Sequence, residues 1–219
     1  MTSPNTKLSA EDRAQTFIDW TRLNSKALTI GFLIVLIAAA GFWFNQQQQR
    51  LRASAAEKAL LLAKQSMAAG NLQLAQSDLQ KVFSKYGKTS AGIEAAMLLS
   101  QIDYDQGKFQ DGITRLEKVA GSSAAGSNES AILSLEGDGY SQMGKGGAAA
   151  RVYERAAEAT TFENEKSYQL SKAARAYQAA GDTAKARAAW TALLNDPKAQ
   201  AVAAEARVRI GELTARPAK

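Results

Sequence analysis

One stretch of the sequence has the spacing of a phosphate-binding loop. Residues 139–145 read G-x-x-x-x-G-K, a pattern in which backbone N–H groups and the lysine contact phosphates. Such a loop also needs a preceding strand and a following Ser or Thr that holds Mg²⁺. Here Gly146 stands where the hydroxyl is needed, and residues 131–138 are predicted to be helical. We therefore interpret the stretch as a turn between helices, and expect no nucleotide, other cofactor or small-molecule ligand.

The acidic pairs are the next candidates for chemistry. Glu163 and Glu165, like Asp103 and Asp105, are two residues apart, and side chains at that spacing do not face each other on a helix. The chain also has no cysteine and no histidine, which excludes thiolate nucleophiles, imidazole acid–base catalysis and Cys/His zinc sites. We expect a protein that is not an enzyme and that holds no metal.

The charge distribution argues against a nucleic-acid partner. The chain has 27 Lys and Arg residues against 21 Asp and Glu residues, but the basic excess is scattered along the sequence. Nucleic-acid-binding proteins concentrate such residues in a stripe or patch. We expect a solvated basic surface that can lie close to anionic lipid, and no bound nucleic acid.

Residues 27–44 are predicted to form a transmembrane helix. These eighteen residues carry no charge, and Trp43 lies between Phe42 and Phe44 as in an interfacial aromatic belt. A helix of this length spans about 27 Å, close to the hydrocarbon thickness of about 30 Å. The alternatives are a buried helix of a soluble domain and a cleaved signal peptide with its cleavage site near residues 38–40.

An uncleaved signal anchor is the interpretation that we favour. A long region precedes the apolar run, it is interrupted by Glu11, Asp12 and Asp19, and bulky aromatics would follow the cut. Basic residues are balanced on the two sides, so they do not decide the orientation: Lys7, Arg13, Arg22 and Lys26 precede the run, and Arg50, Arg52, Lys58 and Lys64 follow it. Because the positive-inside rule applies to short segments, we predict a cytoplasmic N-terminus and a C-terminal domain outside the cytoplasm.

The soluble part contains a four-fold internal repeat. Gly70, Gly107, Gly144 and Gly181 each follow the one before by 37 residues, and each lies between two helix-like runs. Glycine takes the left-handed conformation that ends a helix, so each is predicted to form the turn of a helix pair. At fixed distances after each glycine come a small residue, a large apolar residue and a further apolar residue, as one apolar stripe requires. The positions are Ala75, Gly112, Ala149 and Ala186, then Leu79, Leu116, Tyr153 and Trp190, then Val82, Val119, Ala156 and Leu193.

This pattern resembles the tetratricopeptide repeat, a helix–turn–helix unit of typically about 34 residues. The resemblance covers residues 53–194. It departs at an aromatic position of the first helix, where Tyr140 and Tyr177 occur in the last two repeats but Ser66 and Asp103 in the first two. The extra residues are expected to lengthen helices or loops, as in residues 121–128, and residues 198–214 are predicted to form a helix that caps the last repeat.

The predicted fold is therefore all-α, a transmembrane helix followed by a tetratricopeptide-like α-solenoid of about four helix pairs and a capping helix. We predict a short cytoplasmic tail at 1–26, the signal anchor at 27–44, a polar linker at 45–52, the repeat domain at 53–215 and a tail at 216–219.

The layout as a whole resembles the bacterial ancillary SecYEG translocon subunit family (YfgM-like). The similarity includes residues 11–12, 17–20 and 24–28 around the anchor, and the Tyr-Gly-Lys-Thr sequence at 86–89 between the first two repeats. The resemblance implies an inner-membrane protein with periplasmic repeats. Its implied partners are translocon subunits, periplasmic chaperones and exported polypeptides. The alternative is a structural scaffold or assembly factor of an envelope complex that has no unfolded clients.

The resemblance to tetratricopeptide repeats also implies a partner-binding groove. In that family the ligand-facing positions lie ten, six and three residues before the turn glycine. The predicted groove residues are Leu60, Lys64, Met67, Met97, Gln101, Tyr104, Asp138 and Arg175. The groove would be apolar in the first two repeats and polar in the last two, where Ser134, Ser141, Ser171 and Gln178 occupy the remaining positions. The alternative is that these side chains pack against a neighbouring helix.

Overall fold

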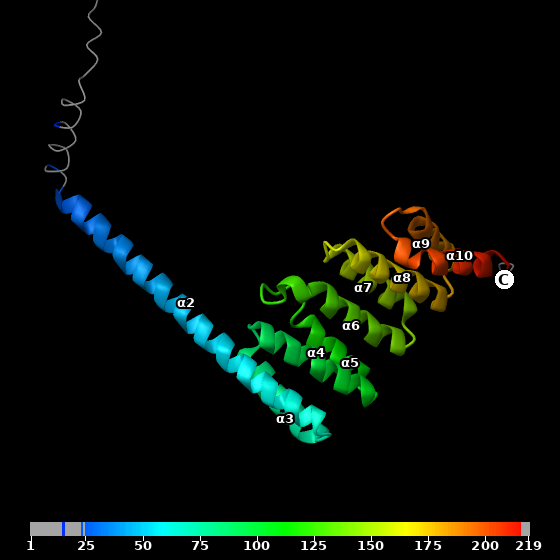
Figure 1. Ribbon diagram of the computed structural model, residues 1–219, viewed down its shortest axis with the longest axis horizontal. Helices are drawn as coiled ribbons and strands as arrows, with labels where there is room; N and C mark the ends of the chain where they lie inside the picture. Colours follow the sequence, from blue (N-terminus) through cyan, green and yellow to red (C-terminus); the bar gives the residue numbers. More distant parts are fainter. Residues whose placement is uncertain (1–14, 16–22, 24, 216–219) are drawn as a thin grey trace, which may run out of the picture. The chain divides into compact units, whose positions relative to one another are not determined.

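The computed structural model describes residues 15, 23 and 25–215, and the chain divides into two compact units, residues 1–51 and 52–219. The predicted all-α fold is confirmed in the described residues, where every regular element is a helix (Figure 1). The elements are α2 (Ser25–Ala68), α3 (Leu72–Tyr86), α4 (Ser90–Asp105), α5 (Phe109–Glu117), the 3-10 helix η1 (Gly126–Asn128), α6 (Glu129–Gln142), α7 (Gly146–Glu158), α8 (Glu163–Ala179), α9 (Thr183–Asn195) and α10 (Gln200–Ala215).

Helix α2 carries the predicted membrane span. By length and composition it is the one helix among the described residues that can cross a membrane. Apolar side chains such as Phe32, Ile37 and Trp43 are exposed along it. The segment 45–52, which we expected to be a linker, is part of the same helix. The segment consists of Asn, Gln, Arg and Leu and contains no Gly or Pro, so nothing in its composition ends the helix. Residues 1–14 of the expected cytoplasmic tail lie outside the described residues.

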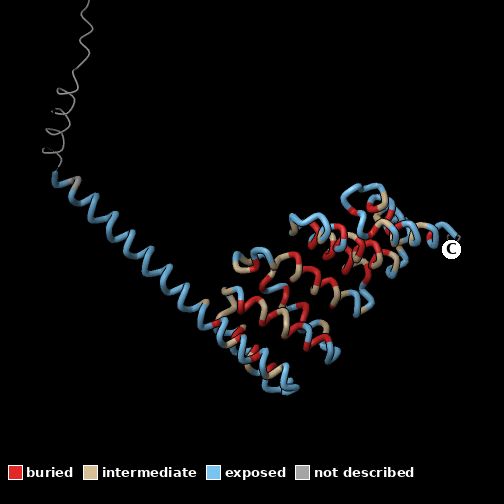
Figure 2. Tube along the Cα trace, viewed as in Figure 1, coloured by how far each residue is buried: buried red, intermediate tan, exposed pale blue. Residues whose placement is uncertain are grey.

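The second unit is a stack of helix pairs. Residues 52–68 of α2 pack with α3 and α4 around an apolar cluster that includes Leu60, Leu79 and Leu99. The pairs α4–α5, α6–α7 and α8–α9 follow in order, and successive helices along this series contact each other. Figure 2 shows buried residues on the facing sides of these helices and exposed residues on their outer sides. This arrangement buries one apolar stripe on each second helix, as the repeat spacing predicted.

The four turn glycines have the predicted left-handed backbone. Gly70, Gly107, Gly144 and Gly181 have φ angles of +77°, +75°, +71° and +79°. Each glycine N–H donates to a carbonyl three residues earlier, and the next N–H donates to a carbonyl five residues earlier, in the first repeat from Gly70 to Met67 and from Asn71 to Ser66. This is the Schellman arrangement, which satisfies the last carbonyls of the first helix. Next to Gly70 and Gly181, the side chains of Asn71 and Asp182 then cap the second helix.

The predicted apolar stripe is also confirmed. The small residues five positions after each glycine are buried, as are the larger residues nine and twelve positions after it. Gly112 is required by packing, because a Cβ atom there would collide with the ring of Tyr104. Gly137 has the same relation to the ring of Tyr153, which lies on the paired helix α7. Aromatic residues of the core are thus accommodated by glycines on neighbouring helices.

The capping helix is confirmed as α10, which begins two residues later than predicted. Residues 196–199 form a turn in which the N–H of Ala199 donates to the carbonyl of Asp196 at 3.0 Å. Helix α10 then packs on α9 and α8 and contributes Val202, Ala206 and Leu213 to a core cluster with Trp190. The cap thus covers an apolar face that the last repeat would otherwise expose.

The extra residues between the second and third repeats form the predicted loop. Helix α5 ends at Glu117, and turns and η1 occupy residues up to Asn128. The backbone N–H of Gly121 donates to both carboxylate oxygens of Glu129, each at 2.9 Å. The loop is therefore held to the start of α6 by a hydrogen-bonded carboxylate.

Three contacts between successive repeats use the position where the sequence departs from the tetratricopeptide pattern. The hydroxyl of Tyr140 donates to Glu117 at 3.2 Å, and that of Tyr177 donates to Glu154 at 2.9 Å. In the second repeat Asp103 holds this position, and Arg115 bridges it to Gln80. The Gln80, Glu117 and Glu154 positions correspond, each ten residues after a turn glycine. The departure in sequence therefore replaces a direct hydrogen bond with a bridged one.

Candidate protein-interaction site

The apolar members of the predicted groove are mostly used for packing. Leu60 and Tyr104 are buried, and Met67 and Met97 are partly buried against core clusters of the first and second repeats. Their position on the first helices turns them toward neighbouring helices as well as toward the groove. Leu60 and Tyr104 thus match the alternative of packing against neighbouring helices, and a buried side chain offers little surface to a partner.

The charged members of the groove have partners within the chain. Lys64 forms an ion pair with Glu94. The Asp138 carboxylate forms an ion pair with the Lys172 ammonium at 2.7 Å and accepts a hydrogen bond from the Tyr153 hydroxyl at 2.6 Å. The ammonium of Lys172 also lies 4.6 Å from the centre of the Tyr153 ring. Burial raises the pKa of Tyr153, and its hydrogen bond to Asp138 adds to this shift. The groove charges of the third repeat are therefore largely neutralised from within.

Arg175 ties the fourth repeat to the cap. Its guanidinium donates to both carboxylate oxygens of Glu205 on α10, at 2.7 and 2.5 Å. These hydrogen bonds raise the pKa of Arg175 and lower the pKa of Glu205. A two-point contact of this kind fixes geometry, so Arg175 holds α8 and α10 together.

Three of the predicted groove residues do line a common pocket. Gln101 and Tyr104 of α4 and Asp138 of α6 border a hollow of about 260 Å³ that also includes Asp105 and Ser141. The hydroxyl of Tyr104 donates to the carbonyl of Leu135 at 3.2 Å, across the two helices. Burial raises the pKa of this hydroxyl, and Asp138 adds to the shift. The hollow is small and polar, and it suits a polar contact better than an apolar segment.

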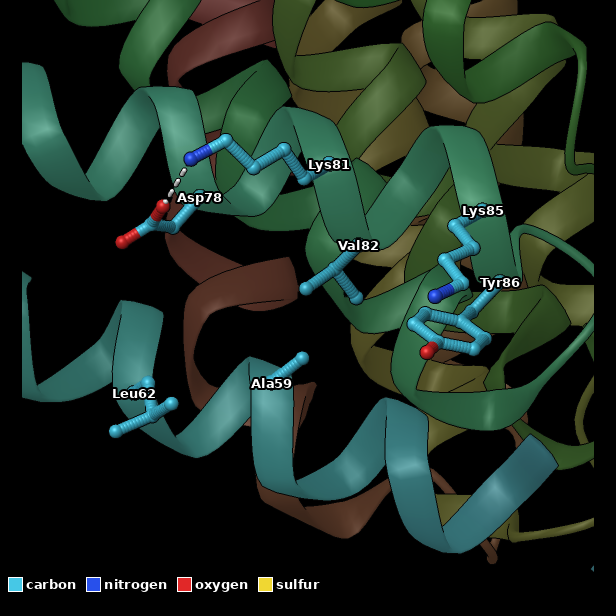
Figure 3. Close-up of a pocket in the computed structure, with 7 residues that line it drawn as sticks. All are labelled: Ala59, Leu62, Asp78, Lys81, Val82, Lys85 and Tyr86. Atoms are coloured by element: carbon cyan, nitrogen blue, oxygen red, sulfur yellow. Dashed lines mark hydrogen bonds and ion pairs between the residues drawn. The ribbon is translucent and has the colours of Figure 1, made fainter. Parts of the chain in front are cut away.

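The larger pocket lies between α2 and α3, where the sequence did not direct attention. It has a volume of about 550 Å³ and is lined by Ala59, Leu62, Asp78, Lys81, Val82, Lys85 and Tyr86. Figure 3 shows Ala59 of α2 pointing toward Val82 of α3, with Leu62 further along α2 and Tyr86 beside Lys85 on α3. Lys81 donates to Asp78 at 2.9 Å on the rim, while Lys85 lies over the Tyr86 ring at 5.2 Å. The pocket therefore has apolar walls and a basic rim, as a protein-binding groove commonly has.

Exposed leucines lie on both helices that form this pocket. Leu62 is 61% exposed, and Leu61, Leu72 and Leu74 are also exposed on α2 and α3. The signal for this surface was present in the sequence as the consecutive leucines 60–62, of which a single helix face can bury only part. We define the open-end surface as Leu61, Leu62, Leu72, Leu74 and the pocket lining.

The stretch that resembles a phosphate-binding loop is a helix end. The N–H of Gly144 donates to the carbonyl of Ser141 and that of Lys145 to the carbonyl of Tyr140, each at 2.9 Å. These donors are therefore already used by the turn between α6 and α7. The acids Glu163 and Glu165 have separate partners as well, Lys198 and Thr160.

The fold and the site together define a helical-repeat interaction module. The chain belongs to the tetratricopeptide repeat-like domain family, whose family model matches residues 51–172. Domains of this family generally mediate protein–protein interactions and are non-catalytic.

Two solved structures have a similar fold. Both contain nearly identical TPR-like repeats from Podosopora anserina, and the first is a variant. The first is 17% identical, with a TM-score of 0.55, and the match covers 73% of this chain and 88% of that one. The second is 16% identical, with a TM-score of 0.53, and the match covers 74% of this chain and 96% of that one. A search of curated proteins found no match.

Proposed function

We propose that the chain is a membrane-anchored, non-enzymatic adaptor that binds other proteins through its repeat domain. The observation that carries this proposal is the open-end surface, an apolar pocket between α2 and α3. It lies on the same helix, α2, that has a segment apolar enough to span a membrane. A partner that docks there is therefore tethered to the membrane through the chain.

The proposed complex is the Sec translocon. The chain would be an ancillary subunit that links emerging secreted proteins to periplasmic folding factors, as the resemblance to the YfgM-like family implies. Residues 1–26 would be cytoplasmic, 27–44 would cross the inner membrane, and 53–215 would be periplasmic. A reporter that is active only in the periplasm, fused after Lys219, is expected to work. Activity of a cytoplasm-only reporter at that position would reverse this topology.

The open-end surface suits an apolar partner segment. Burying one exposed leucine-sized side chain contributes about 1.5–3 kcal/mol, and loss of freedom in both partners offsets part of this gain. A few such contacts give weak, reversible binding, which suits an exchanging partner. The polar hollow bordered by Gln101, Tyr104 and Asp138 is a second contact surface for a folded partner such as a chaperone.

A matched pair of variants tests the proposed docking site. Leu62 and Val208 are both 61% exposed, but Val208 lies on the capping helix α10. Full-length protein carrying Leu62→Asp is expected to lose translocon subunits in co-purification from solubilised membranes. The variant Val208→Asp should retain them, at equal expression and helical content. Equal retention by both variants would show that the open-end surface is not the docking site.

The same co-purification separates the alternative function. A structural scaffold of an envelope complex would retain a fixed set of envelope proteins and no nascent secreted chains. Recovery of such a set, without translocon subunits, would replace the translocon proposal while leaving the interaction role of the repeats in place.

A further inference from the structure

A second pocket, distinct in chemistry from the open-end surface, is lined by four cations. It has a volume of about 480 Å³ and lies where α3 ends and α4 begins. Arg52 of α2, Lys85 and Lys88 around the α3–α4 turn, and Lys118 after α5 all border it. Its lining includes no aspartate and no glutamate. Positive charge is therefore concentrated in a concave site.

These four cations have no acidic partners within the described residues. No carboxylate there lies within 4.0 Å of their side-chain nitrogens, whereas Lys64, Lys81 and Lys172 in the same domain are each ion-paired. Lys85 lies instead over the Tyr86 ring, so no carboxylate of the described residues neutralises its charge. Like charges held close together repel one another, so an anion in the pocket would be stabilised.

Apolar side chains lie among the cations. Phe83 and Val119 both line the pocket, and Val119 is buried. Hydroxyl groups of Ser84 and Thr89 complete the polar part of the lining. A ligand that combines an anionic phosphate with apolar acyl chains matches both parts of this lining.

Chain length keeps Arg52 near the bilayer. It lies only eight positions after Phe44, the last residue of the apolar run. Eight residues span about 12 Å as a helix and no more than about 28 Å when fully extended. The headgroup layer on each side of a bilayer is about 5–8 Å thick. An anionic headgroup is therefore within reach of the pocket that Arg52 borders.

We propose that this basic pocket binds the headgroup phosphate of an anionic phospholipid and so holds the first two repeats against the membrane. The basic pocket shares Lys85 and Tyr86 with the open-end surface, whereas Arg52, Lys88 and Lys118 line the basic pocket alone. Anionic bilayers attract cations near their surface, and each Lys or Arg strengthens the attraction by about fivefold. Removal of three of these cations should therefore lower the ratio of docked to undocked domain by about a hundredfold.

The chain has no cysteine, so one introduced cysteine can carry a spin label at a single site. We would label full-length protein at Ser90→Cys, next to the pocket, and at Gln142→Cys on α6 as a reference. The labelled protein would be placed in bilayer discs of phosphatidylcholine, or of an equal mixture of phosphatidylcholine and phosphatidylglycerol. Accessibility of the label to a lipid-soluble relaxation agent then reports proximity to the bilayer.

The expected result is a gain in lipid proximity at residue 90 in anionic discs only. Salt at about 1 M, where the Debye length falls to about 3 Å, should reverse it. The triple change Arg52→Gln, Lys88→Gln and Lys118→Gln removes cations of this pocket that do not line the pocket of the open-end surface, and it should abolish the gain. The control Lys108→Gln, Lys145→Gln and Lys166→Gln removes the same charge from exposed positions outside the pocket and should leave the gain in place.

Three outcomes would overturn the proposal. The label at residue 90 could show no dependence on lipid charge, or the two triple variants could lose the gain equally, which indicates attraction by net charge alone. Inorganic phosphate added to neutral discs could reproduce the change at residue 90, which would identify a site for free phosphate. Circular dichroism of each variant confirms that the helices are intact, so a lost gain reports the pocket. Retention of translocon subunits by the pocket variant would separate this result from the proposed function.

Discussion

At the carboxyl end of the stack, α10 covers the last repeat and Trp190 is completely buried. At the amino end, the outer face of α2 and α3 leaves Leu62 and Leu72 more than half exposed. The two ends belong to the same repeated helix pair, with a left-handed glycine and the same pattern of buried positions. They differ in what covers the repeat: the capping helix α10 packs on the last repeat, whereas α2 and α3 leave these leucines exposed.

This difference shows that the repeat pattern does not determine how the apolar faces of the end units are covered. In a stack each unit contacts only its neighbours, so the end units carry an apolar face that the repeat pattern cannot bury. Helix α10 resolves this at one end with its own apolar residues, together with the contact between Arg175 and Glu205. At the other end the apolar face remains available, and we propose that a partner protein covers it. Measurements of stability at each end test this contrast.

The largest effect is expected for Trp190→Ala. Removal of a fully buried aromatic side chain should destabilise the repeat domain by about 3–5 kcal/mol, because it leaves a cavity under the cap. Urea unfolding of the detergent-solubilised full chain, followed by circular dichroism, measures this. A loss below about 1 kcal/mol would mean that the cap does not depend on Trp190.

A smaller effect is expected at the turn glycines. Gly181→Ala should cost about 1–2 kcal/mol, since alanine resists a φ of +79° although no atom lies within 4 Å of its Cβ position. Gly147→Ala is the control, because Gly147 is helical and equally open, so alanine there should stabilise by up to about 1 kcal/mol. Thermal unfolding of the two variants measures the difference.

The same backbone strain at the open end should destabilise mainly the adjacent helix and not the whole stack. Gly70→Ala meets a φ of +77° in open space, but its repeat has no cap. We expect faster hydrogen exchange in α3 and a smaller shift of the global melting temperature than for Gly181→Ala. Equal global shifts at the two glycines would mean that the open end is as firmly coupled to the stack as the capped one.

The ion pair at the cap should make stability depend on pH. Arg175 lowers the pKa of Glu205, so the pair's stabilisation is present above the ordinary glutamate pKa of about 4.3. It is lost as the pH falls through the lowered pKa. Both side chains are partly exposed, so Glu205→Gln should cost only about 1 kcal/mol at neutral pH.

The difference between wild type and Glu205→Gln should disappear in acid. The control is Glu94→Gln, which removes the more exposed pair with Lys64 at the open end and should cost less. Stability curves against pH for the three proteins measure this. A gap between wild type and Glu205→Gln that is constant down to strongly acidic pH would argue against the pair as its cause.

The smallest effect on stability is expected for Leu62→Ala. An exposed side chain buries little area, so the free energy of unfolding should change by no more than about 0.5 kcal/mol. Urea unfolding beside Trp190→Ala makes the comparison of the two ends direct. A loss of several kcal/mol would place Leu62 in the core of the first repeat and remove the argument for an open docking surface.

The sequence alone determined the helix pairs of this protein. The 37-residue spacing identified the four turn glycines, and local physics explains why: a left-handed helix end needs glycine, and a stripe of buried side chains needs helical spacing. The capping helix and the loop at 121–128 followed from the same pattern, because both are breaks in it. The apolar run at 27–44 likewise predicted a helix that can span a membrane.

The tertiary structure decided which side chains are available. Leu60 and Tyr104 occupy positions that face a ligand in the repeat pattern, yet neighbouring helices bury them, while Leu62 remains exposed beside a pocket. Asp138 and Arg175 are held by Lys172 and Glu205, residues that lie 34 and 30 positions away along the chain. Helical periodicity specifies the face on which a side chain lies but not the element that packs on that face. That depends on contacts between distant segments, which form only when the repeats stack.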